Sequence, residues 1–448
     1  MTTAFCFLCS LQGRLPPSNR HMCHALQLTS THTNRMLIGQ IPHALILQRV
    51  QPRIWIPLTV IIWSGLTMAC AGCHNFAQIA AVRFLQGFFE ASLYSGTMFI
   101  IGSWYKAEEI SKRTSIFTSI GQVGSMFAGI MMTAIRKTMD NHNGMEGWRW
   151  VFIIDGLMGM PVGIFGLLFL PNTPERTKMP YLSKDEIQFA INRLPPLAHD
   201  SANINVRSLA GRVLKKPTIY ILTMFSILCA MTEAFAFQGC FLLWMKYYED
   251  KFPKTAVNTY PLGIQAVAIT SMILAGIYMD KTKRCLEVGI LCGVLQFTSA
   301  AMLVAPSLST AGTFFAFYLS GSSFMVNPLL YGWGGIIARR GGDNAARAII
   351  LYVMNTGGQL LYTWWGIVLY PATDAPYWKK GAIAVMVAVV CYSGGLYCMC
   401  WLDKRTKETE QLGKTEEPTT TRHGETDEEE SEDAEKYIQV SEPISPKH

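Results

Sequence analysis

Two charged side chains of opposite sign lie seven residues apart in an otherwise apolar stretch. Arg83 and Glu90 stand in the segment 76–103, with Gly87 between them. On an α-helix, two side chains seven positions apart point in directions that differ by about 20°. They are separated by about 10.5 Å along the helix axis. Both groups therefore face one side, where Gly87 lets a neighbour come close. A guanidinium suits a substrate carboxylate, and a carboxyl in changing surroundings can exchange a proton.

Two more acidic residues, Asp155 and Glu233, lie within apolar segments. A charge near the middle of a bilayer costs at least about 2.5–3.5 kcal/mol, so each is a functional candidate. We expect Asp155 to reach the membrane interface. For Glu233, a role in transport and a purely structural role in hydrogen bonding both stay open. For Arg83 and Glu90, the alternative to transport is a structural role in which both bind neighbouring helices. Candidates on later segments to complete a site are polar or aromatic: Asn327, Asn355, Gln359, Tyr362 and Trp364.

The segments that must position these residues are long, apolar and nearly free of charge. Of 448 residues, 50% are apolar and 15% charged, against about 25% charged in soluble proteins. This composition excludes an ordinary cytosolic enzyme, a nucleic-acid-binding protein and a secreted disulfide scaffold. About 20 apolar residues cross a bilayer as a helix. Ten windows are predicted to span it: 54–73, 76–103, 114–135, 150–171, 218–245, 256–279, 288–305, 310–338, 348–370 and 381–402.

Lys and Arg are divided unevenly between the loops at the two ends of these spans. One set of loops holds 22 and the other holds 8. Because positively charged loops stay in the cytoplasm, the 172–217 loop and the C-terminus are expected inside. In that loop Ser183 and Glu186 form a capping-box pattern, which predicts a short helix through Asn192.

The last 46 residues, 403–448, differ from the rest in charge. They hold 14 acidic and 7 basic residues, whereas the preceding chain holds 31 basic and 17 acidic. With few apolar residues such a segment cannot bury a core, so we expect a disordered cytoplasmic tail. It is either a solubilising terminus or a target for kinase or ubiquitin machinery.

Two motifs that resemble cofactor or metal sites do not fit their surroundings. Cys70-Ala-Gly-Cys73-His74 matches a haem-attachment pattern but lies at the end of a span. Cys6 and Cys9 with the histidines at 21 and 24 have too short a histidine spacing for a zinc finger. There is no phosphate-binding glycine loop and no G-x-S-x-G. We predict no enzymatic activity, no cofactor and no metal.

Several motifs resemble those of a known transporter family. Arg83-Phe-Leu-Gln-Gly87 with Glu90 resembles the fourth-helix motif of the major facilitator superfamily, in the anion:cation symporter branch. The segments G-S-W-Y-K (102–106), G-W-R-W (147–150) and P-N-T-P-E (171–175) are similar to the fungal allantoate permease group. The segment 370–381, with Asn355 before it, looks like that of pantothenate and biotin (vitamin H) transporters. G-Q-V-G (121–124) lacks the antiporter signature, which favours symport.

The resemblance implies an all-α membrane fold of two helix bundles that open alternately to either side. The chain would hold ten to eleven spans, with the first helix of the usual twelve missing. It would divide into an irregular N-terminus (1–35), an incomplete first bundle (36–171), a central loop (172–217), a six-helix second bundle (218–402) and the tail (403–448).

The resemblance also implies residue roles. Arg83 would bind the substrate carboxylate or act in gating, and Glu90 would carry the proton. Asp280 and Arg284 lie in a segment similar to the family's cytoplasmic gating loop, where Asp280 would meet a helix N-terminus. The predicted site comprises Arg83, Gly87, Glu90, Glu233, Asn355 and Trp364, with Asp280 and Arg284 for gating.

The function expected from these features is import of a small organic anion, pantothenate-like, together with protons across a plasma membrane. Its partners would be that anion, protons and the lipid bilayer, and no nucleic acid. Other substrates of the same group are biotin, allantoate and nicotinate. Two further alternatives stay open, a non-transporting degenerate copy or receptor and an exporter of secondary metabolites.

Overall fold

The computed structural model describes residues 39–416, apart from 41, 48, 107–108, 140, 195–210, 212, 238, 253–255, 306–307, 341–343 and 372–373. The chain forms two compact units, Met1–Thr406 and Lys407–His448. Of the second unit only 407–416 are described, and they are helical. The predicted irregular N-terminus, with Cys6 and Cys9, and most of the acidic tail lie outside the described residues.

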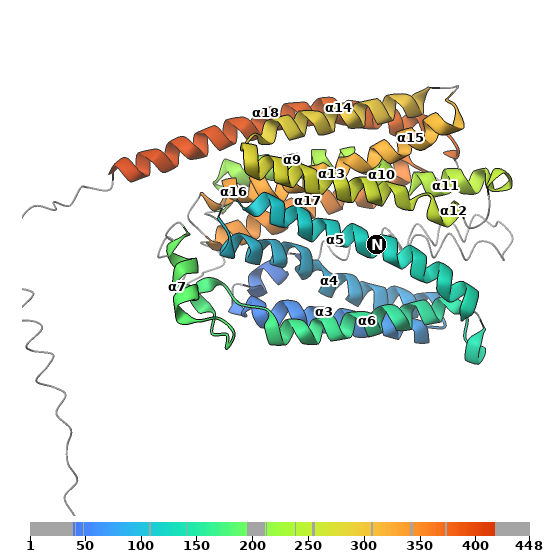
Figure 1. Ribbon diagram of the computed structural model, residues 1–448, viewed down its shortest axis with the longest axis horizontal. Coiled ribbons are helices and arrows are strands. Elements are labelled where there is room, and N and C mark those ends of the chain that lie inside the picture. The colour runs from blue at the N-terminus through green and yellow to red at the C-terminus, as the bar shows by residue number, and fades with distance from the viewer. Residues whose placement is uncertain are drawn as a thin grey trace, which may run out of the picture. The chain divides into compact units, whose positions relative to one another are not determined.

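Four long helices form the first bundle, seen in the lower part of Figure 1. Their starts follow local signals, since α3 has proline at its first position and Asn75 and Gln78 form a capping box ahead of α4. The helices are α3 (Pro52–Ala69), α4 (Phe76–Trp104), α5 (Ile110–Thr138) and α6 (Gly147–Phe169), with the short turns η2 (Cys70–Gly72), η3 (His142–Gly144) and η4 (Pro174–Arg176).

Glycines of α6 bring it into close contact with α3. A Cβ at Gly156 would lie 2.6 Å from the carbonyl oxygen of Ser64, and one at Gly163 would lie 2.6 Å from Cγ1 of Ile61. No side chain larger than hydrogen fits at either position without a shift. Small residues of this kind let membrane helices pack backbone to backbone.

The predicted short helix of the central loop is confirmed as α7 (Lys184–Asn192). The backbone nitrogen of Glu186 donates to Ser183 Oγ at 3.2 Å, and the Ser183 nitrogen donates to Glu186 Oε2 at 2.9 Å. These bonds from Ser183 lower the pKa of the Glu186 carboxyl. The pair satisfies two backbone donors that the first turn leaves unbonded.

The second bundle contains helices that break inside the predicted windows. The window 218–245 is divided into α9, α10 and α11, and 310–338 is divided into α15, η7, η8 and α16. The elements are α9 (Pro217–Thr232), α10 (Ala234–Phe237), α11 (Cys240–Tyr247), η6 (Glu249–Lys251), α12 (Ala256–Thr259), α13 (Leu262–Thr282), α14 (Cys285–Val304), α15 (Thr310–Ser320), η7 (Gly321–Met325), η8 (Pro328–Trp333), α16 (Gly334–Arg339), α17 (Asn344–Leu369) and α18 (Lys379–Glu416).

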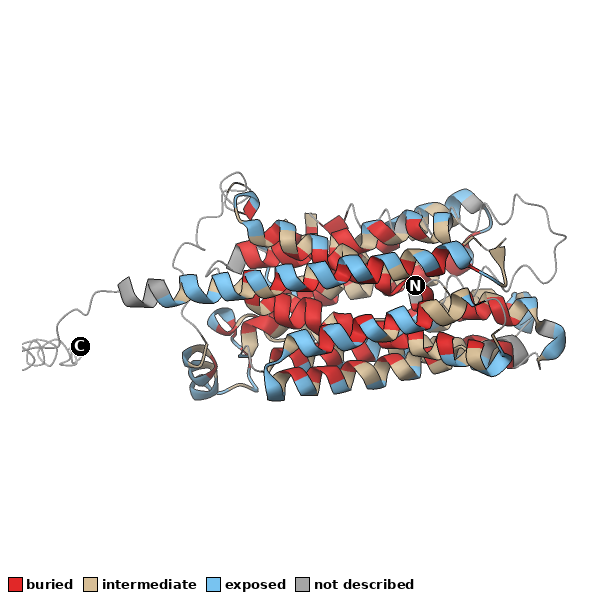
Figure 2. Ribbon diagram, turned by 90° about the horizontal axis from the view of Figure 1, so that it is seen from above, coloured by how far each residue is buried: buried red, intermediate tan, exposed pale blue. Residues whose placement is uncertain are grey.

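The outward faces of the helices are apolar, as a lipid surface requires. Large side chains such as Ile120, Val162 and Leu274 are 62%, 64% and 67% exposed. Figure 2 shows exposed residues along the outer faces and buried ones between the helices. Exposed apolar area of this extent is stable in contact with lipid and not in water. Six helices of the described chain are long and apolar enough to span a membrane: Pro52–Gly72, Ile110–Ile135, Gly147–Phe169, Leu262–Thr282, Cys285–Val304 and Lys379–Gln411.

Candidate functional site

Two helix breaks of the second bundle meet around one buried carboxyl. Glu233 follows the last residue of α9 and is 8% exposed. Its Oε1 accepts a hydrogen bond of 3.0 Å from Nδ2 of Asn327, which lies between η7 and η8. Its Oε2 accepts one of 2.6 Å from the hydroxyl of Tyr362 on α17. Both carboxyl oxygens are therefore held by neutral donors from other elements.

The electrostatic balance at Glu233 is set by these neutral groups. Among the described residues, no cation lies within salt-bridge distance of this carboxyl. Burial opposes the charged form, whereas the two donated hydrogen bonds stabilise it. The site can thus take or lose a proton when its hydration or its donors change.

A second polar contact extends this cluster toward the first bundle. The hydroxyl of Tyr331, on η8, donates to Oδ1 of Asn355 on α17 at 3.3 Å. The ring of Tyr94, on α4, packs edge-on against Tyr331 with centroids 4.9 Å apart. Asn355 is 7% exposed. The predicted residues Glu233 and Asn355 therefore lie in one polar region at the contact of the two bundles.

Arg83 makes its contacts within the first bundle. Its Nη1 donates to Oε1 of Gln86 at 3.0 Å, and Nε2 of Gln86 donates to Oγ1 of Thr67 on α3 at 3.1 Å. The guanidinium also lies 4.9 Å from the ring centroid of Phe152 on α6. These contacts connect α4 to α3 and to α6.

The other predicted site residues lie at different depths. Gly87 is buried, Glu90 is half-buried on the same helix, and Asp155 is exposed on α6. Trp364 is 48% exposed on α17 and has no place in the polar cluster around Glu233. Of the candidates on later segments, Asn327 and Tyr362 contact Glu233 directly.

The predicted gating residues lie where α13 ends. The backbone nitrogen of Lys112, in the first turn of α5, donates to Oδ2 of Asp280 at 2.8 Å. A carboxylate at a helix N-terminus interacts favourably with the unbonded backbone N–H groups and the helix dipole. This contact joins the two bundles. Arg284 instead pairs with Glu287 at 3.0 Å on the surface.

At the same end, arginines bind the last carbonyls of α4. Nη1 of Arg339 donates to the oxygens of Gly102 and Tyr105 at 3.1 and 2.9 Å. Nη1 of Arg347, which is 2% exposed, donates to the same Gly102 oxygen at 3.0 Å. From the end of α7, Arg193 donates to the Trp104 oxygen at 2.7 Å. Cations are favourable at a helix C-terminus. The contacts of Arg339 and Arg347 hold the second bundle against the first, and that of Arg193 holds the central loop against α4.

A comparison with protein-family models decides the family. Residues 29–363 match the model of the Major Facilitator Superfamily. The chain belongs to this superfamily. It is therefore a multi-pass membrane transporter of small organic substrates rather than an enzyme, and the all-α fold inferred from its motifs is confirmed.

Curated relatives and a solved structure agree with this membership. The pantothenate transporter liz1 of Schizosaccharomyces pombe is 32% identical over 392 residues, covering 86% of this chain and 75% of the relative. The pantothenate transporter FEN2 of Saccharomyces cerevisiae is also 32% identical over 392 residues, covering 85% and 75%. The structure of the proton:xylose symporter XylE superposes with a TM-score of 0.60 at 13% identity, covering 84% of this chain and 86% of that one. The last likeness concerns the fold alone.

The sequence did not identify the arginines that bind the carbonyls at the end of α4. It also did not identify Tyr331, whose hydroxyl donates a hydrogen bond to Asn355. Arg339 and Arg347 were counted only as positive charges at span ends. The G-S-W-Y-K segment that ends α4 was recognised as a motif. A sequence motif does not predict which arginine or lysine side chain donates hydrogen bonds to its backbone carbonyls. The haem-like cysteines Cys70 and Cys73 are buried, free thiols.

Proposed function

We propose that the protein imports a small organic anion of the pantothenate type together with protons, by alternating access of its two bundles. The two pantothenate transporters at 32% identity support this substrate class. The predicted motifs at 354–381 support it as well. In this proposal the protein lies in the plasma membrane with the 172–217 loop and the C-terminus inside.

The observation that carries the proposal is the buried carboxyl of Glu233 between Asn327 and Tyr362. Protonation of this carboxyl removes one negative charge from a buried site, and no cation among the described residues lies within salt-bridge distance of it. Proton binding there would change the electrostatics of a site shared by three helices. We assign Glu233 to proton coupling, and Glu90 stays a prediction for the same role.

Arg83 is proposed to attract the substrate carboxylate from within the first bundle. Its planar guanidinium carries five N–H donors. Within the described residues, Gln86 accepts a hydrogen bond from the Nη1 group only. The arginine contacts on the α4 carbonyls would close the cytoplasmic end while the site is open outward. Protonation and substrate binding would then favour the state in which those contacts part.

The test is uptake of radiolabelled pantothenate in yeast cells that lack their own transporter. We expect uptake that depends on an inward proton gradient. Glu233→Gln should abolish accumulation above the external concentration while leaving exchange of internal for external pantothenate, because exchange needs no net proton movement. Glu146→Gln, an exposed carboxyl ahead of α6, is the control and should leave uptake unchanged.

Two results would contradict the proposal. Absence of uptake despite surface expression would exclude pantothenate and direct the search to biotin, allantoate and nicotinate. Gradient-driven accumulation that survives Glu233→Gln but not Glu90→Gln would move proton coupling to the first bundle.

A further inference from the structure

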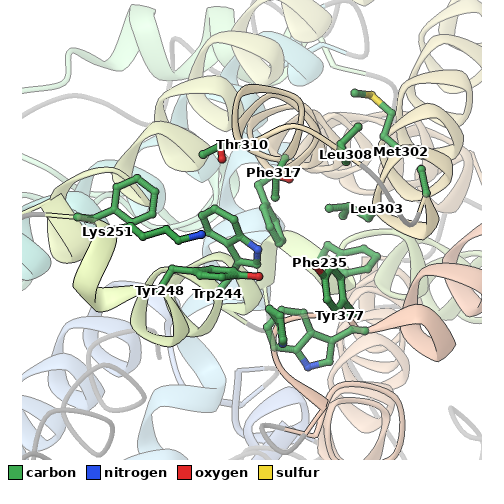
Figure 3. A pocket seen from close by; sticks show the side chains of 15 residues that line it. Phe235, Trp244, Tyr248, Lys251, Met302, Leu303, Leu308, Thr310, Phe317 and Tyr377 are labelled. Atoms are coloured by element: carbon green, nitrogen blue, oxygen red, sulfur yellow. The ribbon is translucent and has the colours of Figure 1, made fainter.

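The second bundle contains a cavity of about 200 Å³ away from the polar cluster. It is lined by residues of α10, α11, the end of α14, the start of α15 and the segment 376–378 just before α18 (Figure 3). Figure 1 shows α11 at the end of the bundle opposite to α16, whose last residue is Arg339. In the orientation proposed above, the α11 end is the outer end.

Aromatic rings that face inward line the cavity. Trp244, Phe317 and Trp378 are 6%, 1% and 4% exposed. Tyrosine and tryptophan at span ends commonly form a belt facing the lipid headgroups. Rings so deeply buried do not serve that purpose, and packing alone would leave no cavity between them. The lining therefore has the character of a binding pocket for a flat or branched apolar group.

The inner wall is rigid. Phe241 stacks on Phe317 with centroids 4.9 Å apart, and Phe235 meets Phe317 edge-on at 6.4 Å. On the opposite side, Nε1 of Trp378 donates to the oxygen of Pro371 at 2.9 Å. Side chains fixed in this way bind a ligand with little loss of their own conformational freedom.

One cation is part of this lining of aromatic rings and polar groups. Lys251 is the single charged side chain among the described residues around the cavity. Its Nζ lies 4.6 Å from the ring centroid of Tyr248, and Figure 3 shows the side chain extending toward Tyr248 and Trp244. The hydroxyls of Thr310 and Tyr377 complete the rim. An ammonium group beside rings and hydroxyls suits a ligand with one carboxylate, a polar chain and an apolar body.

One residue that lines the cavity is close in sequence to the buried carboxyl of Glu233. Phe235, which lines it, lies two residues beyond Glu233 on the short helix α10. We propose that this cavity is an outer binding site for the transported organic anion, with the substrate carboxylate at Lys251 and its apolar body against Trp244 and Phe317. This inference rests on the proposed function, because it takes the substrate to be that anion.

The test measures KM and Vmax for pantothenate uptake by variants of the full chain. Lys251→Gln should raise KM about threefold to tenfold with Vmax unchanged, the effect of losing one partly exposed ion pair. Lys251→Arg should restore most of the affinity. The matched control is Lys380→Gln, an exposed lysine at the start of α18 that does not line the cavity. Its KM should equal that of the unchanged protein.

A second variant leaves the lysine in place. Thr310→Trp puts a large ring at the rim and should raise KM by filling the cavity. Equilibrium binding of radiolabelled pantothenate to the purified protein in lipid nanodiscs gives a direct count. We expect two sites per chain in the unchanged protein, and in Lys251→Gln one of the two should bind about threefold to tenfold more weakly.

The outcomes separate this inference from the function itself. Normal uptake by the unchanged protein with KM unaltered in Lys251→Gln and Thr310→Trp would overturn the outer site and leave the function standing. An equal rise of KM in Lys380→Gln would also overturn it, because general surface charge would then explain the effect. Absence of pantothenate uptake and binding by the unchanged protein would overturn both.

Discussion

At the scale of residues, Glu233 takes hydrogen bonds from partners 94 and 129 positions further along the chain. A hydrogen bond to a charged group contributes about 1.5–3 kcal/mol, more than one between neutral groups. The charged form of this carboxyl therefore depends on Asn327 and Tyr362 staying in place. A movement of the segment that carries Asn327 would change one of these bonds, and a movement of α17 would change the other.

A double-mutant cycle tests this dependence. We expect Tyr362→Phe to reduce proton-driven accumulation about tenfold, from the loss of one charge-assisted hydrogen bond. In the Glu233→Gln background, where exchange of internal for external pantothenate is expected to remain, the same change should leave the exchange rate almost unchanged, because the carboxyl that Tyr362 binds is already absent. Accumulation and exchange are measured with the four proteins. A loss of exchange on adding Tyr362→Phe to Glu233→Gln would mean that Tyr362 acts elsewhere.

Sequence reasoning placed Glu233, Asn327 and Tyr362 among the candidates without joining them. Spacing along one helix relates Arg83 to Glu90, since both lie on the same element. It does not relate residues on different helices, because the rotation of each helix against its neighbours is fixed by packing. Trp364 illustrates this limit: its segment was located, but its side chain lies 48% exposed on the outer face.

At the scale of elements, the close approach of α5 and α13 depends on Gly276. A Cβ at this position would lie 2.1 Å from Oγ of Ser115 and 3.0 Å from the carbonyl oxygen of Ser111. The backbone atom cannot rotate away, so a larger residue must push the helices apart. The contact between Asp280 and the first turn of α5 lies one turn further along α13.

We therefore expect Gly276→Leu to destabilise the bundle contact by about 1–3 kcal/mol, the usual cost of overpacking. Thermal unfolding of the purified protein should begin at a lower temperature, and uptake should fall. Gly394→Leu on α18 is the control, because nothing lies within 4 Å of a Cβ there. An unchanged unfolding temperature in the first variant would show that the contact is loose.

Helix positions were predictable where apolar runs end at clear signals, as at the Asn75 cap of α4 and the Ser183 cap of α7. The break after α9 was not, whereas the proline at 328 does indicate the one where η8 begins. The stretch around Glu233 contains no proline, and the turn at Gly239, with φ of 68°, lies within apolar sequence. A hydropathy profile predicts one continuous span for such a segment, whereas the hydrogen bonds of Glu233 stabilise a break in the helix.

At the scale of the whole molecule, the two bundles meet closely at the end that holds Arg339. A Cβ at Gly332, on η8, would lie 3.4 Å from Cβ of Ser111 on α5. Disulfides need Cβ atoms about 3.5–4.5 Å apart, so this pair lies at the short end of the separation for a cross-link. The alternating access proposed above requires these two positions to separate in each cycle.

The double variant Ser111→Cys with Gly332→Cys should lose uptake after mild oxidation and regain it with a reducing agent. Each single variant should be insensitive to oxidation, which controls for the natural cysteines. A locked protein that still transports would show that the bundles need not part at this end.

The arginine contacts on the α4 carbonyls have a consequence for the cell that makes this protein. Opening that end breaks several charge-assisted hydrogen bonds at once, among them those of Arg339 and Arg347 to Gly102, so an idle carrier stays sealed. A sealed carrier passes no ions, so idle copies leave the membrane voltage unchanged. If the protein imports its substrate as proposed, a cell can raise its uptake capacity by making more of it.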